Sequence, residues 1–213
     1  MNYDQIIKNV NIYGLEESIR GAKFPMATDT DVLTTELTPG IKKLAMSPKG
    51  EGHDTWLNGV IVQFDLTFTV KAWTEAERYS FLNFVSSEST MHRITRFDLD
   101  KSYIDYVDSE IVSIMKRKVK QYNDIQKYFS EHESELTFGD AQQIREEQTE
   151  RYLQILYSNP CGMKLTARMT TNYRQLKTIY AQRHNHRLPE WRAFCEWLTT
   201  LPHSEFITGK EEA

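Results

Sequence analysis

The stretch GVIVQFDLTFTV, residues 59–70, decides the fold class because the polarity of its side chains alternates. Apolar residues occupy every second position: Val60, Val62, Phe64, Leu66, Phe68 and Val70. Polar residues stand between most of them: Gln63, Asp65, Thr67 and Thr69. Successive side chains of a strand point to opposite faces, so this pattern predicts a strand with one apolar face. Residues 163–170, MKLTARMT, alternate in the same way and predict a second strand.

The residues after the first strand predict a helix. Thr74 stands three residues before Glu77, the spacing of a capping box, in which each side chain satisfies a free backbone N–H. We therefore expect a helix that begins there and ends between Ser87 and Thr90.

Longer helices are predicted between and after the two strands. From Ile104 to Phe129 apolar residues recur every three or four positions, which is typical of an amphipathic helix. A second long helix is expected over residues 140–157, followed by two more after Thr171 and after Leu188. Strands interspersed with long helices predict a mixed α+β or α/β fold. We expect one domain, residues 1–208, and a flexible tail, residues 209–213.

Composition excludes several classes of protein. With 39% hydrophobic and 26% charged residues, the chain resembles ordinary globular proteins. A net charge of -4 argues against general binding to duplex nucleic acid but permits a local basic pocket. No apolar run approaches the roughly 20 residues of a membrane helix, so we expect a cytoplasmic protein. Cys161 and Cys195 lack the spacing of a zinc site and are expected to be buried thiols.

The stretch MTTNYRQLKTIYAQRHNHRLPEW, residues 169–191, carries several groups suited to an anion. Asn172 and Arg174 stand where the helix should begin, and free N–H groups at a helix start attract phosphate. Arg183 shares a helical face with Leu176, so it is expected to be buried and to need an anionic partner. That partner is either a carboxylate of the long helices or a bound phosphate or anionic base. His184 and His186 are expected in a surface loop.

Three other segments combine charged residues with turns. MHRITR, residues 91–96, contains His92, Arg93 and Arg96, and is interpreted either as a solvated turn or as a basic site. In GHDTW, residues 52–56, Gly52 permits close approach of the backbone to a ligand beside His53 and Thr55. KRKVK, residues 116–120, is expected on the solvated side of a helix. The usual nucleotide, hydrolase and metalloprotease motifs are absent from the sequence.

The order of these segments resembles the flavin-dependent thymidylate synthases, the ThyX family. GHDT at 52–55 corresponds to a Gly-His-Glu-Thr segment of the family, and VKA at 70–72 matches the end of the following strand. Near the C-terminus, Asn172, Arg174, Leu176 and Arg183 keep the family's register of Asn-x-Arg-x-Leu and a later Arg. The likeness covers roughly residues 50–95 and 155–195.

The resemblance implies a ThyX-like fold with a central, mostly antiparallel sheet packed by long helices. It also implies a homotetramer that binds FAD and dUMP and transfers a carbon from methylenetetrahydrofolate to C5 of uracil, with NADPH as reductant. Residues that would contact FAD by this correspondence are His53, Thr55, His92, Arg93, Asn172 and Arg174. Arg183 and Arg96 would hold the dUMP, and Arg183 would stabilise the base in its partly anionic form.

The sequence departs from the family in the MHRITR motif, in a longer helix before it and in RHNHRLPEW, which matches the family only loosely, and these departures leave three hypotheses. Met91 stands where the family signature Arg-His-Arg has its first Arg, and the Ser, Glu and Arg that follow it in the family are missing. The first hypothesis is a thymidylate synthase or an enzyme that modifies a related pyrimidine nucleotide. The second is a ThyX-like scaffold that binds nucleotide or flavin without methylating. The third is an assembly or nucleic-acid-interaction protein built on the long helices.

Overall fold

The computed structural model describes residues 1–48 and 50–210, whose contacts divide the chain into two compact units. The first unit comprises Met1–Phe68, Ala72–Ser87 and Thr166–Ala213. The second comprises Thr69–Lys71 and Glu88–Leu165. The candidate site residues are distributed over both units, so each unit is described separately.

The first unit contains most of a four-stranded sheet and six short helices. Its strands are β1 (Ile7–Tyr13), β2 (Ile61–Thr69), β3 (Asn83–Ser87) and β4 (Lys164–Asn172). Its helices are α1 (Leu15–Gly21), α2 (Pro39–Ala45), α3 (Val70–Ala76), α7 (Tyr173–Arg183), α8 (Pro189–Leu198) and α9 (Glu205–Thr208). Helix α3 and the ends of β2 and β4 continue into the second unit.

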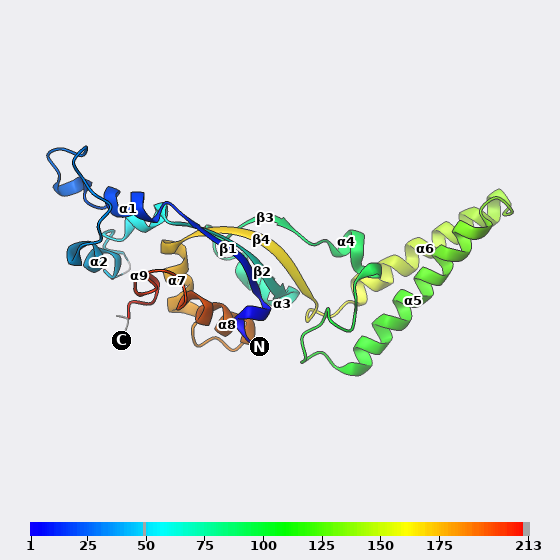
Figure 1. Cartoon of the computed structure of the whole chain (residues 1–213). Helices are drawn as coiled ribbons and strands as arrows, with labels where there is room; N and C mark the ends of the chain where they lie inside the picture. The colour runs from blue at the N-terminus through cyan, green and yellow to red at the C-terminus, as the bar shows by residue number, and fades with distance from the viewer. Residues whose placement is uncertain (49, 211–213) are drawn as a thin grey trace. The chain divides into compact units, whose positions relative to one another are not determined.

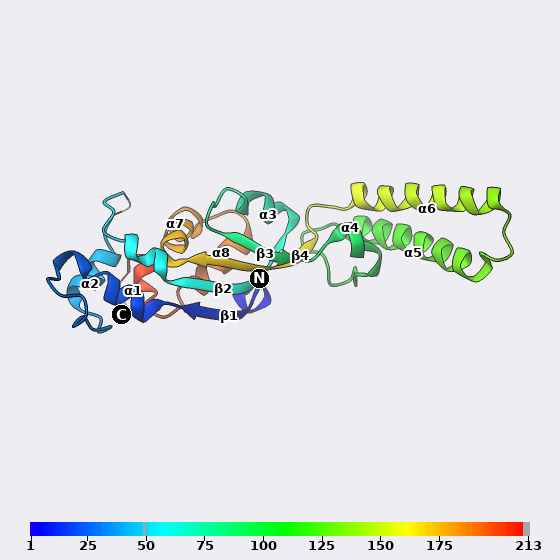
Figure 2. The ribbon, with the colours of Figure 1, turned by 90° about the horizontal axis from the view of Figure 1, so that it is seen from above.

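The strands lie side by side in the order β1-β2-β4-β3 (Figure 2). Strand β1 runs antiparallel to β2, with Ile12 opposite Val62, and β3 runs antiparallel to β4, with Phe84 opposite Met169. Both strands predicted from alternating polarity are present, as β2 and β4. The predicted α+β class with a mostly antiparallel sheet and long helices is therefore confirmed.

The apolar face of β2 forms the core of the first unit. Val62, Phe64, Leu66 and Phe68 have no exposed surface, and helices α7 and α8 lie on this side of the sheet (Figure 1). The ring of Phe64 packs against Trp197, and the ring of Phe68 packs against Trp191, with centroid distances of 4.7 and 4.9 Å. Burial of such aromatic side chains dominates core energetics, so α8 fixes the helical layer beneath the strands.

The second unit contains α4 (Thr90–Arg93), α5 (Ser109–His132) and α6 (Phe138–Ser158). Helices α5 and α6 run alongside each other in both views and share a core built around Met115, Val119 and Ile155 (Figures 1 and 2). Both predicted long helices are confirmed. The first begins later than expected because the side chain of Asp108 accepts from the N–H of Glu110 at 2.7 Å and caps the helix there.

The helix predicted from the capping box is wrong over most of its length. Helix α3 begins at Val70, directly after β2, and ends at Ala76, whereas residues 83–87 form strand β3. The sequence NFVSS contains residues that favour strands, and pairing with β4 adds backbone hydrogen bonds that a helix there would forgo. Tertiary pairing therefore overrides the local helical signal.

The two cysteines differ in exposure. Both are free thiols, and Cys195 is buried as predicted, whereas Cys161 is exposed, so its predicted burial is wrong. Cys161 lies in the turn just before β4, outside any helix or strand. Burial raises the pKa of Cys195 to about 12, which keeps this thiol protonated and unreactive.

Two further expectations concern the ends of the chain and membranes. Part of the predicted tail, residues 211–213, lies outside the described residues, and the single domain of residues 1–208 stays a prediction. Across residues 1–48 and 50–210, every helix is too short or too polar to cross a membrane.

Candidate functional site

A cleft of about 950 Å³ follows helix α7 in the first unit. Four other segments complete its walls: residues 46–48 with 50 after α2, residues 54 and 58 before β2, residues 78–81 after α3, and residues 207–210 at the end of α9. Among the described residues, five cationic side chains line it, against one carboxylate: Arg78, Arg174, Lys177, Arg183 and Lys210, against Asp54. The cleft is therefore suited to an anionic ligand.

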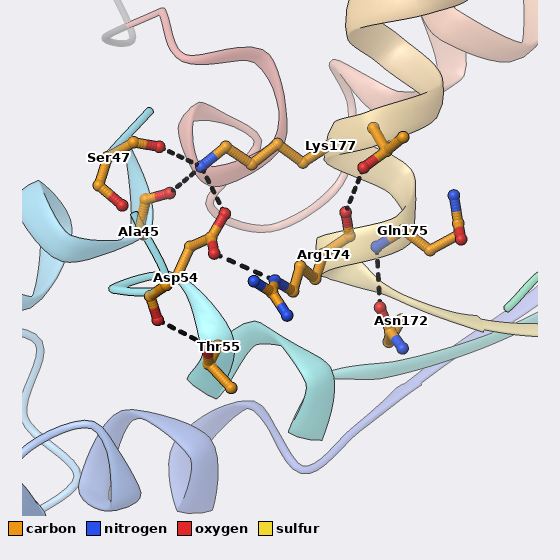
Figure 3. Close-up of polar contacts among 10 residues, drawn as sticks. Ala45, Ser47, Asp54, Thr55, Asn172, Arg174, Gln175 and Lys177 are labelled. Carbon is orange, nitrogen blue, oxygen red and sulfur yellow. Dashed lines mark hydrogen bonds and ion pairs between the residues drawn. The ribbon is translucent and has the colours of Figure 1, made fainter. Parts of the chain in front are cut away.

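Helix α7 begins at the cleft because Asn172 caps it. The side-chain oxygen of Asn172 accepts a hydrogen bond from the backbone N–H of Gln175 at 2.8 Å (Figure 3). The next residue, Tyr173, is fully buried and donates its hydroxyl to the carbonyl of Pro202 at 2.7 Å. Burial raises the pKa of Tyr173, so the hydroxyl remains a donor. The start of α7 is thus held by the Asn172 cap and by the hydrogen bond of Tyr173 to Pro202.

A buried carboxylate joins two cations at this end of α7. Asp54 is only 3% exposed, and its two oxygens accept from Nε of Arg174 at 3.0 Å and from Nζ of Lys177 at 2.9 Å (Figure 3). Lys177 also donates to the backbone carbonyls of Ala45 and Ser47 at 2.8 and 2.7 Å. All three ammonium protons of Lys177 are therefore used, and they tie the segment after α2 to α7.

Arg174 keeps most of its hydrogen-bonding capacity. Only its Nε is engaged, by Asp54, and the two terminal nitrogens have no hydrogen-bond partner among the described residues. The side chain is 37% exposed and lines the cleft. Two adjacent free nitrogens form the planar fork that pairs with two oxygens of a phosphate.

Arg183 occupies the other end of α7 and is almost fully engaged. Its Nε donates to the hydroxyl of Tyr79 at 2.7 Å, and Nη1 donates to Glu75 at 2.9 Å. The guanidinium lies over the ring of Trp191, 5.0 Å from its centroid. The predicted burial of Arg183 is confirmed. Its partner within the protein is a carboxylate, as one interpretation expected, but Glu75 belongs to α3 and not to a long helix.

His186 completes the cluster around Arg183. Its Nε2 lies 2.7 Å from Nη1 of Arg183, and its Nδ1 faces the backbone N–H of Leu188 at 3.2 Å. Because Nδ1 accepts from Leu188, the neutral ring carries its proton on Nε2, which also lies 3.3 Å from Oε2 of Glu75. Burial and then the charge of Arg183 lower the pKa of His186, whereas Glu75 acts in the opposite direction. His186 is therefore partly buried, in contrast to the exposed loop residue that was predicted; His184 is exposed.

The remaining predicted site residues are exposed. His53 and Thr55 flank the buried Asp54, and the hydroxyl of Thr55 donates to the carbonyl of Gly52. His92, Arg93 and Arg96 belong to the second unit, where all three side chains are exposed, together with Met91. The structure thus brings together Asp54, Arg174 and Lys177 at one end of the cleft and Arg183 at the other; the roles assigned to the exposed residues stay predictions.

Sequence reasoning missed the carboxylates that organise the cleft. Asp54 stood inside the GHDT segment, between the two residues that were singled out, and a single acid in a loop carries no signal of its own. Glu75 stood inside a segment interpreted as a capping box, so its charge was assigned to a helix start. The helical spacing of Lys177, three residues after Arg174, was the one pattern that could have indicated a shared partner.

Comparisons with known proteins identify the fold through solved structures of low sequence identity. No family model and no curated protein matches the sequence. A crystal structure of flavin-dependent thymidylate synthase ThyX from Helicobacter pylori, complexed with FAD and dUMP, matches with a TM-score of 0.61 and 13% identity. The match covers 94% of this chain and 97% of the other. A second Helicobacter pylori ThyX structure with FAD and dUMP has the same TM-score and coverage at 12% identity. The chain therefore has the fold of flavin-dependent thymidylate synthase ThyX.

Proposed function

We propose that this chain is a FAD-dependent, thymidylate synthase-like enzyme. In this proposal it transfers a one-carbon unit from methylenetetrahydrofolate to C5 of dUMP, or modifies a related pyrimidine nucleotide, with NADPH as reductant. The observation that carries the proposal is the cationic cleft along α7, lined by Asn172, Arg174 and Arg183, in a chain with the ThyX fold.

The residues of the cleft fit a dinucleotide such as FAD. Its diphosphate carries negative charge, and the free fork of Arg174 at the capped start of α7 supplies matching donors. Lys210 and Arg78 add positive charge to the cleft walls. A volume of about 950 Å³ lies at the upper end of the range typical of ligand pockets. Bound FAD would supply hydride transfer, chemistry that amino-acid side chains lack.

Arg183 has the position expected of a group that polarises a pyrimidine ring. Its Nη2 has no hydrogen-bond partner among the described residues, and the side chain lines the cleft. A fixed cation beside a ring carbonyl stabilises the negative charge that makes C5 nucleophilic. The buried ring of Trp191 below the guanidinium keeps water away from that side, which strengthens this electrostatic effect.

A turnover assay tests the proposal. The full-length protein would be incubated with FAD, NADPH, methylenetetrahydrofolate and dUMP, and the nucleotide product analysed by mass spectrometry. The proposal predicts a nucleotide with one added carbon at C5, and far slower formation of this product with Arg183→Ala. If wild-type protein that binds both FAD and dUMP gives no product, the chain is not a methylating enzyme for dUMP.

A scaffold that binds nucleotide or flavin without methylating is the second candidate. Two observations favour it: Met91 is exposed where the family has an arginine, and Asp54 already compensates part of the charge of Arg174 and Lys177. Both reduce the number of cations available to an anionic ligand. Flavin binding without turnover would support this candidate over the first.

The assembly and location of the protein are part of the proposal. The family resemblance favours a homotetramer in the cytoplasm, with pyrimidine nucleotide and folate as its ligands and without nucleic-acid or membrane binding. Light scattering of the purified protein measures the number of subunits directly, and a monomer would contradict the tetramer.

A further inference from the structure

The donors of Arg183 can be counted one by one. A guanidinium has five N–H groups, one on Nε and two on each terminal nitrogen. Nε donates to Tyr79 at 2.7 Å, and Nη1 donates to Glu75 at 2.9 Å. Of the three nitrogens, only Nη2 has no partner among the described residues.

The surroundings of Arg183 hold the guanidinium plane in one orientation. Trp191 lies under it, and the hydroxyl of Tyr79, which accepts from Nε, donates in turn to the side chain of Gln182 at 3.0 Å. The Glu75 and Arg183 side chains are 17% and 10% exposed, so water competes little for their ion pair. Rotation of Arg183 toward a ligand would break these contacts at once.

We infer that Glu75, together with Tyr79, is a positioning residue for Arg183. Their hydrogen bonds engage Nη1 and Nε, so Nη2 is the single nitrogen left to donate toward the cleft. The inference rests on the proposed function, since it specifies which part of a pyrimidine nucleotide Arg183 contacts. That part is a lone carbonyl oxygen of the ring and not the phosphate.

The geometry of arginine pairing explains this choice. A phosphate or carboxylate pairs best with two neighbouring nitrogens, either Nη1 with Nη2 or Nε with Nη2. Each of these edges contains a nitrogen that Glu75 or Tyr79 already uses. A ring carbonyl needs only one donor nitrogen, which Nη2 provides. Arg174, whose two terminal nitrogens are both free, retains the edge that a phosphate requires.

Calorimetric titration with two ligands tests the inference. The probes are dUMP and 2′-deoxyuridine, which share the ring and differ by the phosphate, and the FAD-loaded protein is used throughout. Arg183→Gln should weaken the binding of dUMP and of deoxyuridine by about 10- to 100-fold each, because a charge-assisted hydrogen bond contributes about that much affinity. The ratio of the two affinities should stay unchanged. Glu75→Gln keeps an oxygen acceptor for Nη1 but removes its charge, so the Nη1–Nη2 edge is held less strongly and can pair with phosphate. Binding of deoxyuridine should weaken by about tenfold and binding of dUMP by less.

Matched controls separate positioning from folding. Glu77→Gln makes the same substitution two residues away at an exposed position and should leave both affinities unchanged. Tyr79→Phe keeps the ring that packs on Trp191 and removes the hydroxyl that accepts from Nε and donates to Gln182, so it should weaken the binding of both ligands even if Arg183→Gln does not fold. The melting temperature of each variant identifies a global folding defect.

Two results would overturn the inference. Equal affinities in Glu75→Gln and wild type would remove Glu75 as a positioning residue, and loss of dUMP binding alone in Arg183→Gln would assign Arg183 to the phosphate. A wild-type protein that binds neither FAD nor dUMP would instead overturn the proposed function, on which the inference rests.

Discussion

The two ends of helix α7 present the same residue type in two different states. Arg174, near the start, is 37% exposed and uses one nitrogen on Asp54, whereas Arg183, at the end, is 10% exposed and uses two nitrogens on Tyr79 and Glu75. Each has a carboxylate partner from a segment distant in sequence. What differs is how many donors remain for a ligand.

The partner carboxylates thus differ in how many nitrogens they leave free on each arginine. Asp54 leaves the fork of Arg174 free, which suits a phosphate, and Glu75 leaves Arg183 one donor nitrogen, which suits a carbonyl. Two arginines on one helix could therefore bind the two chemically different parts of a nucleotide-like ligand. The following variants test that division, from the largest expected effect to the smallest.

Removal of Arg183 should have the largest effect. Arg183→Ala deletes the cation that would stabilise negative charge on the ring, so turnover should fall by a factor of about 100 to 1,000. A turnover assay measures it, and light scattering should show an unchanged oligomer. Unchanged turnover would remove Arg183 from the mechanism.

Removal of Arg174 should act on the flavin instead. Arg174→Ala deletes the free fork at the start of α7, so affinity for FAD should fall by about 10- to 100-fold. Fluorescence titration of FAD measures the change. Normal flavin stoichiometry in this variant would mean that the C-terminal family register was misassigned. It would also contradict the assignment of Arg174 to the flavin.

Neutralisation of Asp54 should reduce stability. Asp54→Asn deprives Arg174 and the 16%-exposed Lys177 of their shared counter-charge, which should lower the free energy of unfolding by about 1–3 kcal/mol. Chemical denaturation measures it. Asp124→Asn is a matched control, because Asp124 pairs with Lys120 on the exposed surface of α5 and should contribute only about 0–1 kcal/mol. Equal effects of both variants would contradict a stabilising role for Asp54.

The smallest effect concerns pH. The pKa of His186 is lowered in the folded protein, so below the ordinary histidine value near 6.5 the unfolded chain binds the proton more readily. Stability should therefore be fully present above that pH and decline as the pH falls toward the folded-state value. His186→Asn should show a smaller decrease in melting temperature between about pH 7.5 and 5.5 than the wild type. Parallel curves for wild type and His186→Asn would contradict this.

Sequence patterns predicted the fold where local periodicity and tertiary burial agree. Strands β2 and β4 and helix α5 each bury one face, and that face produces the alternation or the apolar stripe in the sequence. These patterns therefore predicted the correct elements. Strand β3 was mistaken for helix because its residues are exposed at a sheet edge, and its identity depends on pairing with β4. The residues of β3 alone cannot predict this pairing, because β4 lies far away in the sequence.

Of the residues that line the candidate cleft, the sequence predicted Asn172, Arg174 and Arg183. The helical register placed Arg174 and Arg183 on α7 and indicated that Arg183 is buried and needs an anionic partner. The partners Asp54 and Glu75 lie 120 and 108 residues away in sequence, and only the folded chain brings them to α7. The family resemblance already implied different ligands for the two arginines, but which of their nitrogens remain free follows from those partners and could not be predicted.

The absorption spectrum of the purified full-length protein with added FAD, followed by titration of dUMP, tests the central claim most directly. The account predicts an oxidised-flavin spectrum typical of bound FAD in the wild type that shifts as dUMP is added. It also predicts that Arg174→Ala weakens the flavin binding and Arg183→Ala leaves it intact but abolishes the shift. Absence of flavin binding at FAD concentrations well above micromolar would contradict the account and would leave the chain with a ThyX fold that serves a different purpose.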